Sequence, residues 1–301
     1  MKIAIASGKG GTGKTTVAAA LAISLTEEYL GSSDLRGHPL LSRPPLFLDC
    51  DVEAPNAHLF LSPQIQREET AVMWIPRVDE SKCTHCGVCA QVCQFHAIAA
   101  VGKQLMVFPQ LCHGCGSCTL NCPEGAIHEE AYPLGRMVGG KAVGGLDFAQ
   151  GVLNVGEPMA VPVISQLKRW SGAPDGRVVI LDSPPGASCP VVETLRGADY
   201  VILVTEPTPF GLHDLRLAVE VVESLQLPLG VVINRDGLGN AGVEDFCRQY
   251  GLPVLMRIPF RREYAEGIAR GQSLLQVAPD RLADFHHMFQ AILRQTGEVT
   301  P

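Results

Sequence analysis

Short runs of apolar residues recur along the chain and predict strands that are buried on both sides. Such runs occupy residues 2–6, 46–49, 178–181, 200–204 and 229–233. Strands without polar alternation are typical of parallel sheets whose two faces are both covered by helices. Stretches of helical character separate the runs, so the pattern predicts an α/β fold with a mostly parallel sheet.

Three helices follow from the same pattern. Residues 15–25 carry Ala and Leu on one face, residues 213–225 lie between two predicted strands, and residues 281–295 are amphipathic. Few positive charges lie on the polar face of the last helix, so we expect it to pack on the sheet rather than bind lipid. Its apolar positions are Leu282, Phe285, Phe289, Ile292 and Leu293. Residues 31–45, rich in Gly, Ser and Pro, predict an irregular connection.

Residues 76–132 interrupt the alternation of strands and helices. The segment has few large apolar side chains, so bound metal clusters would have to organise it. We therefore expect a first part of the α/β domain at residues 1–75, a small α+β insert at 76–132, and the second part at 133–301. The glycine-rich stretch at residues 139–145 predicts a loose return from the insert.

Composition restricts the class of protein. The 301 residues are 46% hydrophobic and 18% charged, with a formal net charge of −7. No run reaches the roughly 18–20 apolar residues of a membrane helix, and the first strand leaves no room for a signal peptide. The charge argues against a nucleic-acid partner. Cysteines that cluster at metal-binding spacing indicate a reducing compartment, so we expect a cytoplasmic protein.

Eight of the eleven cysteines occur in two copies of the spacing Cys-x2-Cys-x2-Cys-x3-Cys. This spacing is that of a bacterial ferredoxin with two [4Fe–4S] clusters, in which the fourth cysteine of each run binds the other cluster. The predicted ligand sets are Cys83, Cys86, Cys89 and Cys122 for one cluster, and Cys112, Cys115, Cys118 and Cys93 for the other. A proline follows Cys122, as the bacterial pattern expects, whereas Gln94 follows Cys93.

Two other interpretations of the insert are weaker. Zinc also binds four thiolates, but two complete ferredoxin runs favour iron–sulfur clusters. Four neighbouring histidines would suit a Rieske-type site, yet each cluster already has four cysteines, so we interpret them as surface residues. These histidines are His85, His96, His113 and His128.

A second motif opens the chain. Residues 8–15 fit the phosphate-binding loop G-x4-G-K-[ST] between a strand and a helix. The backbone N–H groups of such a loop and the positive end of the helix bind phosphate. Lys14 would reach the β- and γ-phosphates, and Thr15 would offer its hydroxyl to Mg²⁺. The strand at residues 179–182 would bring Asp182 to the same ion.

The segment Lys-Gly-Gly-Thr-Gly-Lys-Thr-Thr at residues 9–16 resembles the deviant phosphate loop of the MinD/ParA and nitrogenase iron protein class. In that family the additional lysine, here Lys9, reaches the nucleotide of a partner subunit. Asp51 matches the aspartate that positions the attacking water, and Asp49 is a weaker candidate for a structural or Mg²⁺-linked role. Gly186 matches the segment that senses the γ-phosphate.

The resemblance covers nearly the whole chain. More specifically, the chain is similar to MinD-superfamily ATPases that contain an inserted ferredoxin domain. It implies ATP, because Asn234 followed by Arg235 matches the asparagine that binds adenine, and residues 258–263 resemble the loop that closes over the base. It also implies a nucleotide-dependent dimer, of identical or related subunits. The implied nucleotide-binding residues are Gly10, Gly11, Thr12, Gly13, Lys14, Thr15, Thr16, Asn234, Arg235 and Pro259.

Three cysteines lie outside the two runs. Cys50, at a strand end, and Cys247, in an amphipathic segment, are interpreted as packing residues. Cys189 follows Asp182 by seven residues, an offset similar to that of a cluster-binding cysteine in the nitrogenase iron protein. An inert, half-buried thiol is the alternative for Cys189.

Together the motifs predict an ATPase that couples its nucleotide state to electron transfer through two [4Fe–4S] clusters, toward an unidentified redox protein. One alternative is an iron–sulfur cluster carrier or assembly ATPase, although complete thiolate sets favour retained clusters over cargo. The other is a MinD/ParA-like positioning scaffold with a redox-sensing insert.

Overall fold

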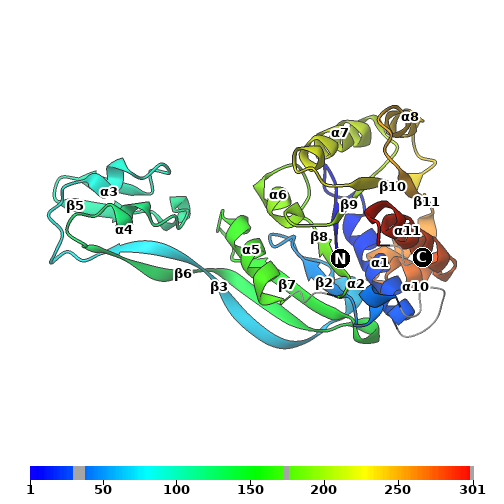
Figure 1. The fold of residues 1–301 in the computed structure, drawn as a ribbon, viewed down its shortest axis with the longest axis horizontal. Coiled ribbons are helices and arrows are strands. Elements are labelled where there is room, and N and C mark those ends of the chain that lie inside the picture. The colour runs from blue at the N-terminus through cyan, green and yellow to red at the C-terminus, as the bar shows by residue number, and fades with distance from the viewer. Residues whose placement is uncertain (30–37, 173–175, 299–301) are drawn as a thin grey trace.

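A computed structural model describes residues 1–29, 38–172 and 176–298. Within these residues the chain forms a nine-stranded sheet (Figure 1). Its strands, from one edge to the other, are β11 (Val254–Pro259), β10 (Leu229–Asp236), β9 (Tyr200–Thr205), β1 (Lys2–Ala6), β8 (Val179–Asp182), β2 (Leu46–Asp49), β7 (Asp147–Leu153), β6 (Ile127–Lys141) and β3 (Gln64–Val78). Neighbours from β11 to β7 pair in parallel, and β6 and β3 are antiparallel. The predicted, mostly parallel α/β sheet is confirmed.

Helices cover both faces of the sheet, as predicted. One face packs on α5 (Ala160–Trp170), α6 (Cys189–Leu195), α7 (Pro209–Ser224) and α8 (Gly242–Gln249). The other packs on α1 (Lys14–Tyr29), α2 (His58–Leu61), α9 (Arg262–Ala269), α10 (Leu274–Val277) and α11 (Leu282–Thr296). Strand β1 contributes side chains to both hydrophobic cores. Ala4 and Ala6 face the helices α5–α8, and Ile3 and Ile5 face the helices on the other side of the sheet. In α11, Phe285 and Phe289 are fully buried, so this helix packs on the sheet as expected.

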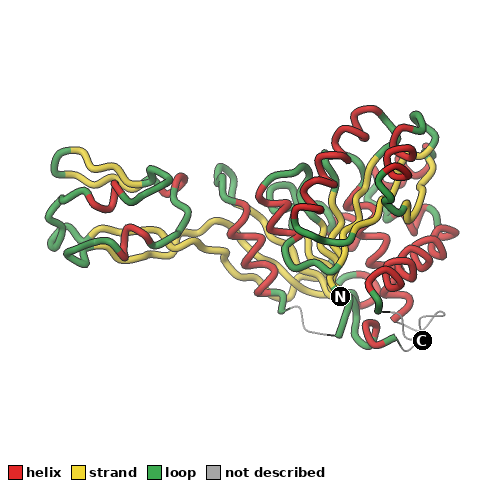
Figure 2. Tube along the Cα trace, turned by 45° about the horizontal axis from the view of Figure 1, so that its top comes forward, coloured by secondary structure: helices red, strands yellow, loops and turns green. Residues whose placement is uncertain are grey.

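Strands β3 and β6 extend beyond the sheet as a two-stranded ribbon (Figures 1 and 2). They pair along almost their whole length, whereas β6 pairs with β7 only over residues 135–141. The ribbon carries the cysteine-rich insert away from the body of the molecule. Both ends of the insert therefore continue directly into strands of the large sheet.

The loose return predicted at residues 139–145 is wrong, because β6 continues to Lys141 and a 3-10 turn follows at Val143–Gly145. Two glycines of β6 instead allow the neighbouring strands to lie close to it. A Cβ atom at Gly140 would overlap the carbonyl oxygen of Gln64, and one at Gly135 would overlap that of Val152. The connection predicted to be irregular at residues 31–45 lies partly outside the described residues, and its described part includes a 3-10 turn at Pro39–Leu41.

Gly140→Ala is expected to destabilise the protein, because the new methyl group must displace the backbone of β3. Overpacking of this kind costs about 1–3 kcal/mol, which thermal unfolding followed by circular dichroism would detect as a lower Tm. Gly139→Ala is the matched control. A Cβ atom there would first meet the ends of two side chains that can move, Arg67 Nε at 3.1 Å and Trp170 Cη2 at 3.2 Å, and the Phe148 carbonyl oxygen only at 3.3 Å, against 1.9 Å for the backbone contact at Gly140. An equal loss in both variants would contradict this account.

The insert has little hydrophobic core. It contains α3 (Val88–Gln91), the hairpin β4 (Ile98–Val101) and β5 (Gln104–Val107), a 3-10 turn (Pro109–Leu111) and α4 (Ser117–Leu120). Its buried cluster consists of Cys89, Ile98, Cys118 and Ile127. Two of these four residues are predicted cluster ligands. The boundaries proposed at residues 75 and 132 fall within β3 and β6, and they stay a proposal.

Candidate functional site

The phosphate loop joins the end of β1 to the start of α1 at Lys14. Gly11 and Gly13 have positive φ angles of 78° and 93°, which residues with side chains rarely adopt. A Cβ atom at Gly13 would also overlap Asn234 Nδ2. Helix α1 therefore directs the N–H groups of its first turn at the loop, an arrangement that binds phosphate.

Two lysines of the loop have carboxylate partners within the chain. Lys14 is buried, and its Nζ lies 3.4 Å from Asp51 Oδ2. Lys9 forms an ion pair with Glu206, which also binds Arg235 Nη1 at 2.7 Å. Burial alone would raise the pKa of Glu206, but the hydrogen bonds and charges of Lys9 and Arg235 lower it overall. Lys9 thus contacts its own chain here, and its contact with a partner's nucleotide stays a prediction.

Asp182 ends β8 directly beneath the loop and is completely buried. Neither of its carboxylate oxygens has a hydrogen-bond partner among the described residues. Burial raises the pKa of Asp182 to about 6, and the charge of Lys14 and the nearby Thr15 hydroxyl oppose this rise. A buried carboxylate with free oxygens is costly unless it is paired or binds a cation. Asp182 and Thr15 therefore fit the oxygen ligands that Mg²⁺ prefers.

Asp49 organises the loop that presents Asp51. Its side chain accepts hydrogen bonds from the backbone N–H groups of Asp51 at 3.2 Å, Asn56 at 3.1 Å and Ala57 at 3.0 Å. Burial and the charge of Asp182 raise its pKa well above the ordinary value. The contacts favour the structural role that the sequence offered for Asp49 over a link to Mg²⁺.

These elements border a cleft of about 610 Å³, within the range of roughly 300–1,000 Å³ for small-molecule sites. The predicted residues that line it are Gly10, Gly11, Gly13, Lys14, Thr15, Thr16, Asp51, Asn234, Arg235 and Pro259. Thr12 is a buried residue of the loop, and neither it nor Lys9 or Asp182 lines the cleft. Sequence reasoning missed its apolar wall of Phe60, Tyr264, Ile268 and Leu274. These residues come from three separate helices, α2, α9 and α10, and in the sequence each gives the same apolar signal as an ordinary core residue.

The Asn234-Arg235 pair ties the end of β10 to the phosphate loop. Asn234 Nδ2 donates to the carbonyl of Thr12 at 2.7 Å, and Oδ1 accepts from the N–H of Arg235 at 2.9 Å. Arg235 Nη2 donates to the carbonyl of Gly11 at 3.0 Å. The contact of Asn234 with adenine stays a prediction.

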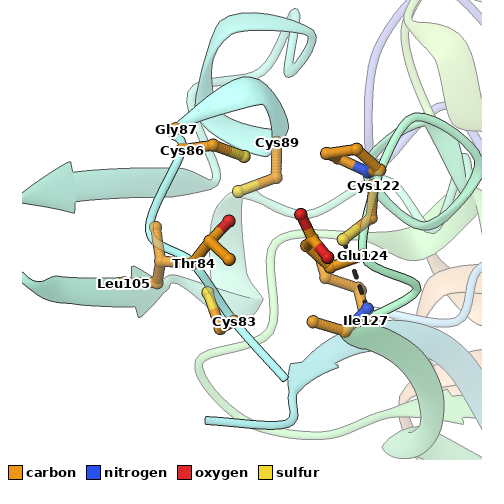
Figure 3. A pocket seen from close by; sticks show the side chains of 11 residues that line it. Cys83, Thr84, Cys86, Gly87, Cys89, Leu105, Cys122, Glu124 and Ile127 are labelled. Carbon is orange, nitrogen blue, oxygen red and sulfur yellow. Dashed lines mark hydrogen bonds between the residues drawn. The ribbon is translucent and has the colours of Figure 1, made fainter. Parts of the chain in front are cut away.

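The eight cysteines of the insert surround two small hollows. Figure 3 shows the first, which Cys83, Cys86, Cys89 and Cys122 line. Cys93, Cys112, Cys115 and Cys118 line the second. Each hollow thus receives three cysteines from one sequence run and the fourth from the other, the grouping that ligand exchange predicts. Four thiols around one small volume fit a [4Fe–4S] cluster.

Backbone N–H groups also point at sulfur. Ala97 donates to Cys93 Sγ at 3.2 Å, and Ala126 donates to Cys122 Sγ at 3.3 Å. The fourth cysteine of each run is therefore held in the same way, four residues before its donor. Such bonds favour the thiolate form and tune the potential of a bound cluster.

The histidines of the insert lie beside the hollows rather than replacing cysteines. His85 Nδ1 is 3.8 Å from Cys83 Sγ, and the His113 ring stacks on Phe95 with centroids 3.6 Å apart. Within the described residues, no three His, Cys, Asp or Glu side chains are close enough to hold a single metal ion.

The cysteines outside the insert differ in burial. Cys50 and Cys247 are buried, and burial raises the pKa of both thiols, that of Cys247 to about 11. Cys189 is exposed at the first residue of α6. No helix in the described part of the chain has the length and apolar character to cross a membrane.

Comparisons with known proteins agree with both sites. A family model described as the CobQ/CobB/MinD/ParA nucleotide binding domain matches residues 3–30, and one described as a 4Fe-4S binding domain matches residues 76–99 and 105–128. The uncharacterized protein MJ0579 of Methanocaldococcus jannaschii is 30% identical over 290 residues, which cover 92% of each chain. The chain belongs to the MinD/ParA family. It is a member that carries two 4Fe-4S binding motifs.

Other likenesses of this MinD/ParA protein are weaker. The septum site-determining protein MinD of Pyrococcus horikoshii, solved with Mg-ADP, has a TM-score of 0.57 and 19% identity, with 100% of this chain and 99% of that chain covered. This similarity shows the common fold alone. An iron-sulfur cluster carrier protein of Aquifex aeolicus is 26% identical over 117 residues, 34% of this chain and 32% of that protein.

Proposed function

We propose that this MinD/ParA protein binds and hydrolyses MgATP, and that its nucleotide state controls electron transfer through two [4Fe–4S] clusters to a protein partner. One observation carries the proposal. The strands that hold the insert, β3 and β6, are also strands of the sheet that forms the nucleotide cleft. A change of the ATPase body therefore has a continuous covalent and hydrogen-bonded route to the clusters.

Each residue of the cleft has a role in this proposal. The N–H groups of residues 10–16 bind the phosphates, and Lys14 leaves Asp51 to contact the β- and γ-phosphates. Asp51 is then free to orient the attacking water. Thr15 and Asp182 would hold Mg²⁺, which neutralises charge that develops on the phosphates.

In the insert, the chain supplies four thiolates to each cluster and donates N–H groups to their sulfurs. A bound [4Fe–4S] cluster supplies one-electron transfer. The solvent-exposed Cys86 and Cys115 mark where each hollow opens toward the surface. Such openings suit electron exchange with a redox protein. The thiolates require a reducing compartment, which the cytoplasm provides.

Lys9 is the proposed link between subunits. Within the chain, Lys9 forms an ion pair with Glu206 beside the cleft. In a nucleotide-dependent dimer, of identical or related subunits, Lys9 would exchange Glu206 for a phosphate of the other subunit. Dimer geometry would then follow the nucleotide.

The test uses protein purified without oxygen, with both clusters bound. The rate at which a chemical reductant reduces the clusters is measured with MgATP, with MgADP and without nucleotide. We expect the rate or the midpoint potential to differ between these states. Equal values in all three states would contradict coupling and favour a scaffold role.

A second candidate function is delivery of clusters to other proteins, which the partial likeness to the Aquifex aeolicus iron-sulfur cluster carrier protein favours. The same preparation distinguishes the two. Incubated with an apo-ferredoxin, a carrier loses iron to the acceptor, whereas an electron-transfer protein keeps its clusters because four thiolates hold each one.

A further inference from the structure

The ribbon leaves the sheet at a defined point, which we call the ribbon root. It consists of residues 71–72 of β3 and 133–135 of β6. The pairing between β6 and β7 runs from Lys141 to Gly135, and on the ribbon side of Gly135 strand β6 no longer pairs with β7. The register shifts at the same place, because Ala71 faces Gly135 and Val72 faces Pro133, which leaves Leu134 as an extra residue. Such bulges bend a strand pair, so the ribbon root sets the direction in which the insert projects.

A side chain of α5 binds the ribbon root. Gln166 Oε1 accepts from the N–H of Val72 at 3.1 Å, and Gln166 Nε2 donates to the carbonyl of Val72 at 2.8 Å. Because β3 is the edge strand of the sheet, these backbone groups would otherwise lack a strand partner. The amide thus acts as one additional rung of the sheet and fixes β3 to α5 at the bulge.

The opposite side of α5 binds helix α6. Lys168 Nζ donates to the carbonyls of Glu193 at 2.6 Å, Thr194 at 3.2 Å and Arg196 at 2.8 Å. These carbonyls lie at the C-terminal end of α6, where a helix lacks internal partners and favours a cation. Residues two positions apart point to different sides of a helix. Gln166 and Lys168 therefore let one helix bind the ribbon and α6 at once.

Helix α6 begins immediately after the segment that faces the nucleotide. Residues 183–188 lead from Asp182 to α6, and within them the N–H of Gly186 donates to the carbonyl of Ser7 at 2.9 Å, at the start of the phosphate loop. Any movement of this segment when a γ-phosphate binds or leaves displaces the start of α6, and Lys168 holds its end.

The loop of Asp51 is bound to β7, one of the strands on which α5 packs. The N–H of Leu153 donates to the carbonyl of Val52 at 2.8 Å. A Cβ atom at Gly151 would lie only 2.7 Å from Val52 Cγ1 and 3.2 Å from Val163 Cγ1. The bare glycine lets Val52, next to Asp51, pack closely against β7, in the same buried cluster as Val163 of α5. The segment after Asp182 thus reaches α5 through α6, and the loop of Asp51 reaches it through β7.

We propose that α5 is the element that transmits nucleotide state to the ribbon root, with Gln166 and Lys168 as positioning residues. The inference rests on the proposed function and names its mechanical route. A packed helix moves as a rigid body because its interfaces do not deform continuously. A shift at α6 or Val52 therefore turns or slides α5, and the Gln166 amide passes that movement to the bulge that aims the insert.

The experiment compares cluster-loaded wild type with Gln166→Leu, Lys168→Met and Lys168→Arg. Arg169→Gln is the control on the same helix, since Arg169 is exposed and its Nη1 donates to the hydroxyl of Ser165, one turn earlier in α5, at 2.7 Å. Hydrogen–deuterium exchange of residues 64–78 and 127–141 is measured with and without a non-hydrolysable ATP analogue. Cluster reduction rates with and without MgATP are measured in the same samples.

We expect the analogue to change exchange at the ribbon root in wild type, Arg169→Gln and Lys168→Arg. In Gln166→Leu and Lys168→Met this change should be lost, while exchange at the phosphate loop still responds and iron content stays at the wild-type level. A nucleotide effect that persists at the ribbon root in both variants overturns the inference, as does its absence in wild type.

The two proposals can fail separately. If MgATP alters cluster reduction in wild type and equally in Gln166→Leu and Lys168→Met, the route through α5 is wrong and the coupled function stands. If the ribbon root responds to nucleotide through α5 but cluster reduction never does, the route stands and the coupled function is wrong.

Discussion

Lys14→Ala is expected to abolish ATP hydrolysis and leave both clusters in place. Lys14 is buried at the floor of the cleft, between Asp51 and the position of the phosphates. Its removal leaves the carboxylates of Asp51 and Asp182 without the charge of Lys14, so phosphate binding and charge stabilisation both weaken. Loss of one such group costs at least about 10²-fold in kcat.

Phosphate release and iron content, measured on the same anaerobic sample, check this prediction. Lys103→Ala is the matched control, because Lys103 lies in the exposed β4–β5 turn of the insert. It should hydrolyse ATP at the wild-type rate. Hydrolysis by Lys14→Ala at that same rate would show that the cleft is not the catalytic site.

The second large effect concerns the pairing of cysteines. Cys86→Ser is expected to lose one cluster, so that iron falls from about eight to about four per chain, while ATP still binds. Cys86 lines the first hollow only, and the second keeps its complete set of four thiols. Cys189→Ser is the control, since this exposed cysteine lines neither hollow.

Double variants test the exchange of the fourth ligand. Cys86→Ser with Cys122→Ser removes two thiols from the same hollow, so about four irons should remain. Cys86→Ser with Cys93→Ser removes two thiols of one sequence run but damages both hollows, so iron should fall close to zero. Iron analysis and electron paramagnetic resonance of the reduced protein separate these outcomes. The reverse order would mean that each run binds its own cluster.

Local sequence was sufficient where a site is built from neighbouring residues. The phosphate loop needs glycines at fixed positions and a lysine at the start of a helix, and residues 8–15 have them in that order. The cysteine spacing likewise limits which thiols can reach one cluster. The continuous apolar strands predicted the parallel sheet, because only strands covered on both faces lack polar alternation.

The same local reasoning failed for β6. The glycines at residues 139–145 read as a loop because glycine weakens isolated strands. In the fold Gly139 and Gly140 lie in β6 between β3 and β7, and at Gly140 a side chain would meet the backbone of Gln64. Two of the three helix predictions were right in place but short, since α1 extends over Lys14–Tyr29 and α7 begins at Pro209, and the third differs from α11 by one residue at each end.

The sequence by itself determined the chemistry of this protein: a phosphate loop, a carboxylate at the end of a buried strand, and eight thiols at cluster spacing. Such features are encoded within a few consecutive residues, so their meaning does not depend on the rest of the chain. Only the tertiary structure decided how they are connected. The pairs Lys9–Glu206 and Gln166–Val72 join residues 197 and 94 positions apart, and contacts over such separations arise from strand order and helix packing, which no local pattern records.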